Sequence, residues 1–324
     1  MTGTTMLLKT IGRRLAYSVL TVWLATLLVF VALQALPGNL AQQLLGQNAT
    51  PAAVARLDAS LGLDRPAWRR YLDWLGGAVH GDFGRSLVSG QPVLSEAGGY
   101  LRNTALLAGI VILAGITLSL VLGVVAGLTR DRWPDLAISG FALLGMSVPE
   151  FTVATVLVLG FAIDLQWFPA VVTAGPTASI GQLLPAVWLP AASLTVVMAA
   201  YIIRMMRTSV IDVLSAEYVT LARIRGLSSR RVLFRHALPN ALLPTLNVIA
   251  VNIAWLVGGV VVVESVFNYP GIGTLMIQAV HNRDLPLLQF IAVFGAATFV
   301  VCNLLADLAS VYLNPRLRTP GRAG

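Results

Sequence analysis

Long apolar runs constrain this chain more than any other feature of its sequence. An α-helix rises about 1.5 Å per residue, so about 20 apolar residues cross a hydrocarbon core of about 30 Å. Backbone groups in lipid must be satisfied within their own segment, and no barrel-like alternation occurs, so runs of this length are predicted to be helices. Six such runs predict an all-α membrane protein with about six transmembrane helices: Leu15–Leu36, Thr104–Leu128, Leu136–Ile163, Leu184–Ile203, Ala241–Val263 and Leu287–Leu313.

The composition excludes several classes of protein. Only 11% of the 324 residues are charged, against roughly 25% in soluble domains. The formal net charge of +8 could suggest nucleic-acid binding, but no basic domain lies outside the spans to carry it, so no nucleic-acid partner is expected. Cys302 is the single cysteine and lies in the last span, so no intrachain disulfide, Cys-based metal cluster or other metal site is expected.

The arginines predict the orientation in the membrane. With six spans, most of the 22 lysines and arginines lie on the side of both chain ends, and the positive-inside rule makes that side cytoplasmic. The first span is too long for a signal-peptide core and is predicted to stay uncleaved. The predicted organisation is a tail and first helix at 1–37, an extracytoplasmic loop at 38–103, a core membrane domain at 104–313 with a cytoplasmic loop at about 204–240, and a cytoplasmic tail at 314–324.

Two local patterns predict helix packing. In the outer loop, Pro66 has helix-start character and apolar residues follow with helical spacing, until Gly76-Gly77 is expected to end the pattern. In the second span, small residues recur every four positions, which lets another backbone approach closely. They are Gly115, Ser119, Gly123 and Gly127, and the sequence leaves open whether their partner helix belongs to this chain or to a second subunit.

Polar residues inside the spans are candidates for a transport pathway. Pro149 is predicted to kink or interrupt the third span, and Glu150 follows it at a depth where a carboxylate is costly. Glu150 could contact an amine-bearing substrate, or it could cap the backbone that Pro149 frees. Asn247 and Asn252 could hydrogen-bond to another helix or to cargo.

An arginine-rich segment at Thr220–Pro239, broken by a glycine, separates two membrane-length runs. Residues 215–225 are compatible with a helix, Gly226 fits the position after a helix where positive φ is cheap, and Ser228 or Ser229 can cap a second helix that Pro239 is expected to close. Lipid headgroups could attract the charge. The helix, turn and helix also predict a rigid knob for a soluble partner, with Val232, Leu233 and Leu238 apolar and Arg231 and Arg235 one turn apart.

These residues resemble the membrane-spanning permease subunits of ATP-binding cassette importers, in the dipeptide, oligopeptide and nickel branch. Ala222, Gly226, Leu238 and Pro239 match the spacing of the family's cytoplasmic loop, although its usual Glu-Ala-Ala opening is Thr220-Leu221-Ala222 here. The similarity covers nearly the whole chain, including LGLDRPAWRRYLDWLGGAVHGDFGRSL, EYVTLARIRGLSSRRVLFRHALPNALLP and VVESVFNYPGIGTLMIQAVHNRDLPLLQ.

The resemblance implies a type I importer permease fold in a bacterial cell membrane, with half of a pore in this chain. It implies a second permease, giving a heterodimer, two cytoplasmic ATPases that bind ATP and Mg²⁺, and an extracytoplasmic substrate-binding protein. The helix near Ser228–Leu238 would be the coupling helix. The resemblance assigns the coupling to the ATPases to the loop 215–239, with Ala222, Arg223, Gly226, Ser228, Arg231, Arg235, Leu238 and Pro239 as its candidate residues.

Catalytic motifs are missing from the sequence. Lys9 is the only lysine and lacks the glycines of a phosphate-binding loop, and no H-E-x-x-H or G-x-S-x-G motif occurs. No catalytic residue and no cofactor are therefore expected in this chain. Short peptides are the first cargo class, from the resemblance alone, and nickel or a nickel chelate is the second, while sugars or glutathione-like compounds stay open. A secondary transporter driven by an ion gradient and a membrane enzyme are the alternatives from other classes.

Overall fold

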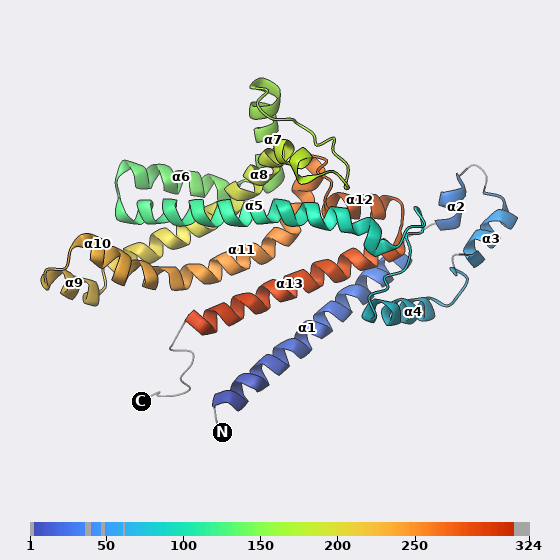
Figure 1. The fold of residues 1–324 in the computed structure, drawn as a ribbon, viewed down its shortest axis with the longest axis horizontal. Helices are drawn as coiled ribbons and strands as arrows, with labels where there is room; N and C mark the ends of the chain where they lie inside the picture. The colour runs from blue at the N-terminus through green and yellow to red at the C-terminus, as the bar shows by residue number, and fades with distance from the viewer. Residues whose placement is uncertain (1–2, 36–39, 47–48, 61, 314–324) are drawn as a thin grey trace. The chain divides into compact units, whose positions relative to one another are not determined.

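The computed structural model describes residues 3–35, 40–46, 49–60 and 62–313. Throughout these ranges the regular structure is helical, without a strand. Figure 1 draws the helices in order along the chain. The described residues form two compact units. The first unit takes its residues from Met1–Asn103 and Gly271–Thr298, and the second takes them from Thr104–Pro270 and Phe299–Gly324.

Helices of very different length build the two units. The first unit contains α1 (Gly3–Gln34), α2 (Leu40–Leu45), α3 (Pro51–Ser60), α4 (Ala67–Val79) and α12 (Ile272–His281). The second contains α6 (Trp133–Ser147), α7 (Glu150–Leu157), the π-helical η2 (Val158–Asp164), α8 (Ile180–Leu214), α9 (Glu217–Ile224), α10 (Ser229–Val232), the π-helical η3 (Leu233–Ala237) and α11 (Leu238–Val266). Two long helices, α5 (Val93–Leu128) and α13 (Leu285–Leu313), contribute residues to both units.

The helices confirm an all-α membrane fold. Four stretches in the described part of the chain are long and apolar enough to span a membrane, at Val93–Leu128, Ile180–Leu214, Ser229–Leu256 and Leu285–Leu305. The α6 and α7–η2 pair adds a fifth candidate. The predicted first span falls in α1, where the apolar stretch that the structure describes is Ala16–Ala32. The second predicted span lies within α5, which is longer than the span because the helix begins at Val93, in the region predicted as an outer loop.

The central helix of the second unit is α8. Within its most apolar window 67% of the residues are buried, against 22–33% for the other three long candidates. Leu194, Met198 and Ile202 lie in its core, together with Leu107 of α5 and Val260 of α11. A largely apolar helix suits this position, because neighbouring helices cover most of its surface.

The small residues of α5 pack against α8 of the same chain, which answers the question that the sequence left open. A Cβ added at Gly123 would lie 2.6 Å from Met206 Cβ, and one at Gly127 would lie 2.7 Å from Val210 Cβ. Ser119, one turn before Gly123 on the same face, is fully buried. The glycines are therefore needed for the close approach of the two backbones.

We expect Gly123→Ala to destabilise the second unit by about 1–3 kcal/mol, since the added methyl group meets a Cβ that can move only with its backbone. Gly115→Ala should cost less, because its nearest neighbour is the flexible Met198 Cε at 2.9 Å, and Gly109→Ala should cost least, because its Cβ would meet nothing within 4 Å. Thermal unfolding of the solubilised chain measures the three variants side by side. Equal melting temperatures would show that α5 does not pack as described.

A buried ion pair joins α6 to α8. Arg207 donates from Nε to Asp135 Oδ1 at 2.5 Å and from Nη2 to Oδ2 at 2.7 Å. The backbone N–H of Asp131 and the hydroxyl of Ser139 also donate to the Asp135 carboxylate. All the hydrogen bonds of this carboxylate come from within the second unit, so the pair fixes the first turn of α6 on α8.

In the first unit α4 packs on α1 through one aromatic residue. Tyr71 is buried, its ring lies 5.2 Å from that of Phe30, and its hydroxyl shares a 2.8 Å hydrogen bond with the Thr26 hydroxyl. The predicted helix after Pro66 is confirmed, but its predicted end is wrong. The helix continues through Gly76 and Gly77 to Val79. Gly77 is needed for packing and does not end the helix, since a Cβ there would lie 2.8 Å from the carbonyl oxygen of Asp82 in the segment that follows.

Candidate functional site

The arginine-rich segment forms a helix, a tight turn and a second helix. α9 ends at Ile224, and Gly226 follows with a φ of +78°, the left-handed conformation predicted for it. The turn is closed by the N–H of Gly226, which donates to the carbonyl of Arg223, and by the N–H of Leu227, which donates to the carbonyl of Ala222. Ser228 is extended and precedes α10. We call residues 217–239 the α9–α10 bracket.

The prediction that Pro239 closes the short helix is wrong. The four residues of α10 lead into η3 and then directly into α11, so that Pro239 lies in the first turn of α11. Proline is tolerated there because its missing N–H falls at the junction with η3, where the regular i→i−4 hydrogen-bond pattern is already interrupted. The N–H of Leu238 donates to the carbonyl of Leu233, five residues back, so the wider π-turn carries the helix across this junction.

A small apolar cluster holds the bracket together. Val219 and Ala222 of α9 and Val232 of α10 are buried against one another, with Leu227 of the turn packed at their edge. At the far end, Asn240 Nδ2 donates to the hydroxyl of Tyr218 at 3.1 Å, which ties α9 to α11. Val232, one of the apolar residues noted in this segment, is interior and stabilises the bracket itself.

The exposed surface of the bracket combines arginine with other apolar residues. Ile224 and Phe234 are 76% and 65% exposed, and Leu221 is also exposed. Arginines surround them, and none has a carboxylate within ion-pair distance in the described part of the chain; they are Arg223, Arg225, Arg230, Arg231 and Arg235. The sequence carried a signal for Leu221 and Ile224, because their i, i+3 spacing lies opposite that of Val219 and Ala222.

The four pathway candidates lie on two elements of the second unit. Pro149 stands before α7, where α6 and the α7–η2 pair bend by 112°, so the predicted kink is a break. Glu150 opens α7, half-buried, and forms no hydrogen bond with another described residue. On α11, Asn247 is exposed, and Asn252 is buried with Nδ2 donating to the carbonyl of Val248 at 2.8 Å. α7 and α11 contact one another, so the candidates lie on adjacent helices.

Comparison with known proteins assigns the chain to a family. Residues 115–319 match the family model of the binding-protein-dependent transport system inner membrane component, and residues 7–120 match the model of the N-terminal part of such components. The chain belongs to this family. It is thus a transport component that crosses the inner membrane several times.

Relatives match this permease over nearly its whole length. The "Probable peptide ABC transporter permease protein y4tP" of Sinorhizobium fredii is 34% identical over 94% of this chain and 98% of its own. The glutathione transport system permease protein GsiC of Escherichia coli is 32% identical over 96% of this chain and 99% of its own.

The permease fold is seen in solved structures. An inward-facing structure of the MetNI methionine ABC transporter contains a chain that matches with a TM-score of 0.55 and 16% identity, over 68% of this chain and 96% of that chain. An amino acid ABC transporter matches with a TM-score of 0.50. These similarities support the fold of the ABC importer permeases.

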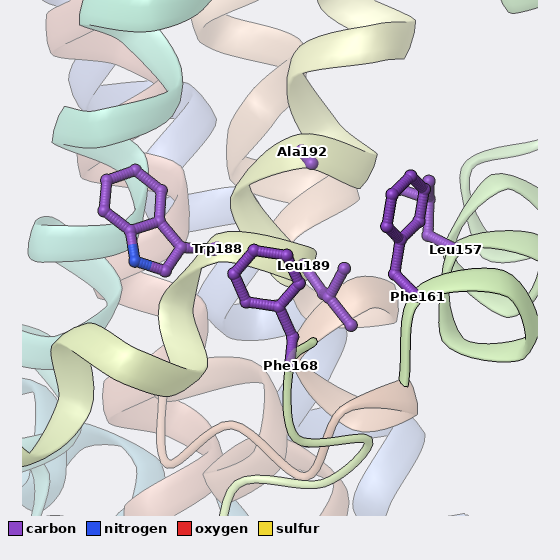
Figure 2. A pocket seen from close by; sticks show the side chains of 6 residues that line it. All are labelled: Leu157, Phe161, Phe168, Trp188, Leu189 and Ala192. Carbon is purple, nitrogen blue, oxygen red and sulfur yellow. The ribbon is translucent and has the colours of Figure 1, made fainter. Parts of the chain in front are cut away.

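One pocket of the permease lies where the broken span meets α8. It has a volume of about 310 Å³ and is lined by Leu157, Phe161, Phe168, Trp188, Leu189 and Ala192 (Figure 2). Figure 2 shows Phe168 and Leu189 near the centre of the view, with Trp188 on one side and Phe161 and Leu157 on the other. None of the four pathway candidates lines this pocket, and its side chains are apolar apart from the indole N–H of Trp188.

The described residues contain no group of three or more His, Cys, Asp or Glu side chains placed to hold a metal ion. The bracket is therefore the feature with the clearest functional geometry in the second unit. Its interior is a buried apolar cluster, its arginines have no carboxylate partner among the described residues, and its exposed apolar side chains are the kind that a protein partner covers.

Proposed function

We propose that this permease forms half of the pathway of an ATP-driven importer for short peptides, and that the α9–α10 bracket receives the motion of partner ATPases. The observation that carries the proposal is the surface of the bracket, where Ile224 and Phe234 are exposed among arginines that have no ion pair with any described carboxylate. The sequence has no phosphate-binding-loop motif. This supports an assembly in which separate partner subunits bind ATP and Mg²⁺.

The proposed assembly contains a second, homologous permease, two cytoplasmic ATPases and an extracytoplasmic binding protein. Both ends of this chain and the bracket would face the cytoplasm, as the distribution of arginine favours. Closure of the ATPases on ATP would move the two brackets, and the long helices would follow as rigid bodies that open the pathway outward. The coupling requires the bracket to bind one ATPase state more tightly than the other, because equal contacts shift no equilibrium.

The peptide cargo is proposed from the relatives. The y4tP permease is named for peptides and GsiC for glutathione, itself a small peptide with a free amine and free carboxylates. Uptake of a radiolabelled dipeptide and of radiolabelled nickel, in a strain from which this chain is deleted and then restored, tests the proposal. Restored dipeptide uptake is the expected result, whereas restored nickel uptake alone would transfer the proposal to a metal importer.

Glu150 is proposed as a pathway residue that contacts amine-bearing cargo, since its carboxylate makes no hydrogen bond with a described residue. We expect Glu150→Gln to lower dipeptide uptake about tenfold, because a charge-assisted hydrogen bond contributes about 1.5–3 kcal/mol. An N-acetylated dipeptide lacks the ammonium group and serves as the control cargo, with uptake equal in the two proteins. Unchanged uptake of the free dipeptide by the variant would remove Glu150 from the pathway.

A further inference from the structure

The first unit contains a second pocket, with a chemistry different from that in Figure 2. Its volume is about 230 Å³, and α1, α4, α13 and the segments before α4 and after Ser86 contribute to it. Most of its wall is apolar, through Phe30, Leu63, Leu87, Leu285 and Pro286. The polar part of the wall is concentrated on α4, which Figure 1 labels, and on the first turns of α13.

Three buried N–H donors of this pocket have no acceptor in the described part of the chain. They are Nε of Arg70, Nε1 of Trp74 and Nε2 of Gln289. Arg70 and Trp74 stand one turn apart on α4, and Gln289 is only 3% exposed. Buried donors are nearly always paired in native proteins, so three at one pocket indicate an acceptor that the described residues do not supply and that a bound ligand can provide.

The charges around the pocket favour an anion. Arg70 donates from Nη2 to Gln34 Oε1 at 2.9 Å, a neutral acceptor that leaves its positive charge unbalanced. The nearby carboxylate of Asp73 lies 3.8 Å from Arg65, and both of these side chains are mostly exposed at the rim. Burial lowers the pKa of Arg70, which means that desolvation opposes the charge and that an anion bound there would relieve it. A guanidinium stays protonated in spite of such a shift.

We propose that this pocket binds a small monocarboxylate, with its oxygens accepting from Arg70, Trp74 and Gln289 and its carbon chain against the apolar wall. A carboxylate offers about four acceptor sites and no donor, and it matches a planar guanidinium. One unbalanced guanidinium and two neutral donors suit a single negative charge better than a phosphate dianion. The volume is below the usual 300–1,000 Å³ of sites for larger ligands, so a short acid or the carboxylate end of a peptide or side chain fits.

Calorimetric titration of the purified full-length complex in nanodiscs with propionate tests this site, and propionamide is the uncharged probe of the same shape. We expect propionate to bind and propionamide to bind at least about tenfold more weakly, since only the charged acceptor forms charge-assisted bonds. No propionate binding, or equal binding of the two probes, would overturn the proposal and leave the pocket to water.

Variants localise the binding to this pocket. Gln289→Leu and Arg70→Met should each weaken propionate binding about tenfold or more, while Arg69→Met, the same change at the exposed neighbour that lies over Trp68, should leave it unchanged. Gln289→Glu would place a carboxylate inside the pocket, so it should abolish binding and raise the melting temperature. Wild-type affinity in both Gln289→Leu and Arg70→Met would disprove the site even if one variant folds poorly.

The same assay distinguishes two sources of the carboxylate, the free end of a peptide and an acidic side chain of a docked protein. Competition of propionate by dialanine, but not by its C-terminal amide, would assign the site to free peptide ends. If propionate binds and dialanine does not compete, the carboxylate belongs to an acidic side chain of a docked protein. The proposal does not rest on the transport function, because binding is measured without ATP or uptake.

Discussion

Gly226→Val is expected to abolish ATP-driven uptake while the chain still inserts in the membrane and assembles with its partners. Gly226 has a φ of +78°, and a Cβ added there would meet nothing within 4 Å. The penalty is therefore conformational. A side chain in the left-handed region costs roughly 1–2 kcal/mol, and a β-branched one resists it more strongly. The turn would open, and α9 would lose its packing on α10.

Uptake of labelled dipeptide into vesicles that contain the whole complex measures this effect, with a fall of about tenfold or more expected. Gly226→Asn is the first control, because asparagine tolerates positive φ and should keep most of the uptake. Gly175→Val is the second, since Gly175 is exposed, has no neighbour within 4 Å of an added Cβ and does not have positive φ. Uptake by Gly226→Val equal to that of the Gly175 control would remove the turn from the mechanism.

Asp135→Ala should destabilise the second unit by about 3–5 kcal/mol, the usual cost of removing one partner of a buried ion pair. The Asp135 side chain is 1% exposed and that of Arg207 is 27% exposed, so the remaining guanidinium would stay largely desolvated without its acceptor. α6 would also lose its anchor on α8. Chemical or thermal unfolding of the solubilised chain measures the change in the free energy of unfolding.

The matched control is Asp73→Ala, which breaks the pair of Asp73 with Arg65. Both of these side chains are mostly exposed, and such pairs contribute about 0–1 kcal/mol. The double variant Asp135→Leu with Arg207→Met should recover much of the lost stability, because apolar groups of similar size can replace a buried pair. Equal melting of Asp135→Ala and Asp73→Ala would show that the buried pair does not stabilise the fold.

Local features of the fold could be predicted because the bilayer and the backbone impose them. The length of an apolar run determines whether it can span, so five predicted spans coincide with long or paired apolar helices. Positive φ at Gly226 follows from the low cost of that conformation for glycine. The interruption at Pro149 follows from its missing N–H, although the 112° bend depends on how α7 packs and not on the proline alone.

Features that depend on distant residues could not be predicted. The glycines of α5 indicated close packing, but only the fold identifies Met206 and Val210 of α8 as their neighbours. Asp135 and Arg207 are 72 residues apart in sequence, and no local pattern indicates that they pair. The role of Pro239 was predicted wrongly, because the sequence around a proline that ends one helix looks the same as the sequence around a proline in the first turn of the next helix.

The sequence predicted where the α9–α10 bracket lies in the chain, but not which of its side chains are buried and which are exposed. The bracket lies where the arginines and Gly226 placed it, with Ala222 inside. The exposure of Phe234 and the burial of Val232 depend on how α9 packs on α10. In the first unit, the donors of Arg70, Trp74 and Gln289 meet only because α4 and α13 border one pocket.

Cross-linking from the bracket tests its role as the coupling element most directly. A cysteine introduced by Phe234→Cys, in a chain with Cys302→Ser, would be joined to the ATPase subunits of the intact complex by a short reagent with and without ATP. The account predicts a cross-link to an ATPase whose yield changes when ATP is bound. A Phe234→Cys complex that imports peptide normally but forms no ATPase cross-link in either state, or reacts only with a reagent confined to the extracytoplasmic side, would contradict it.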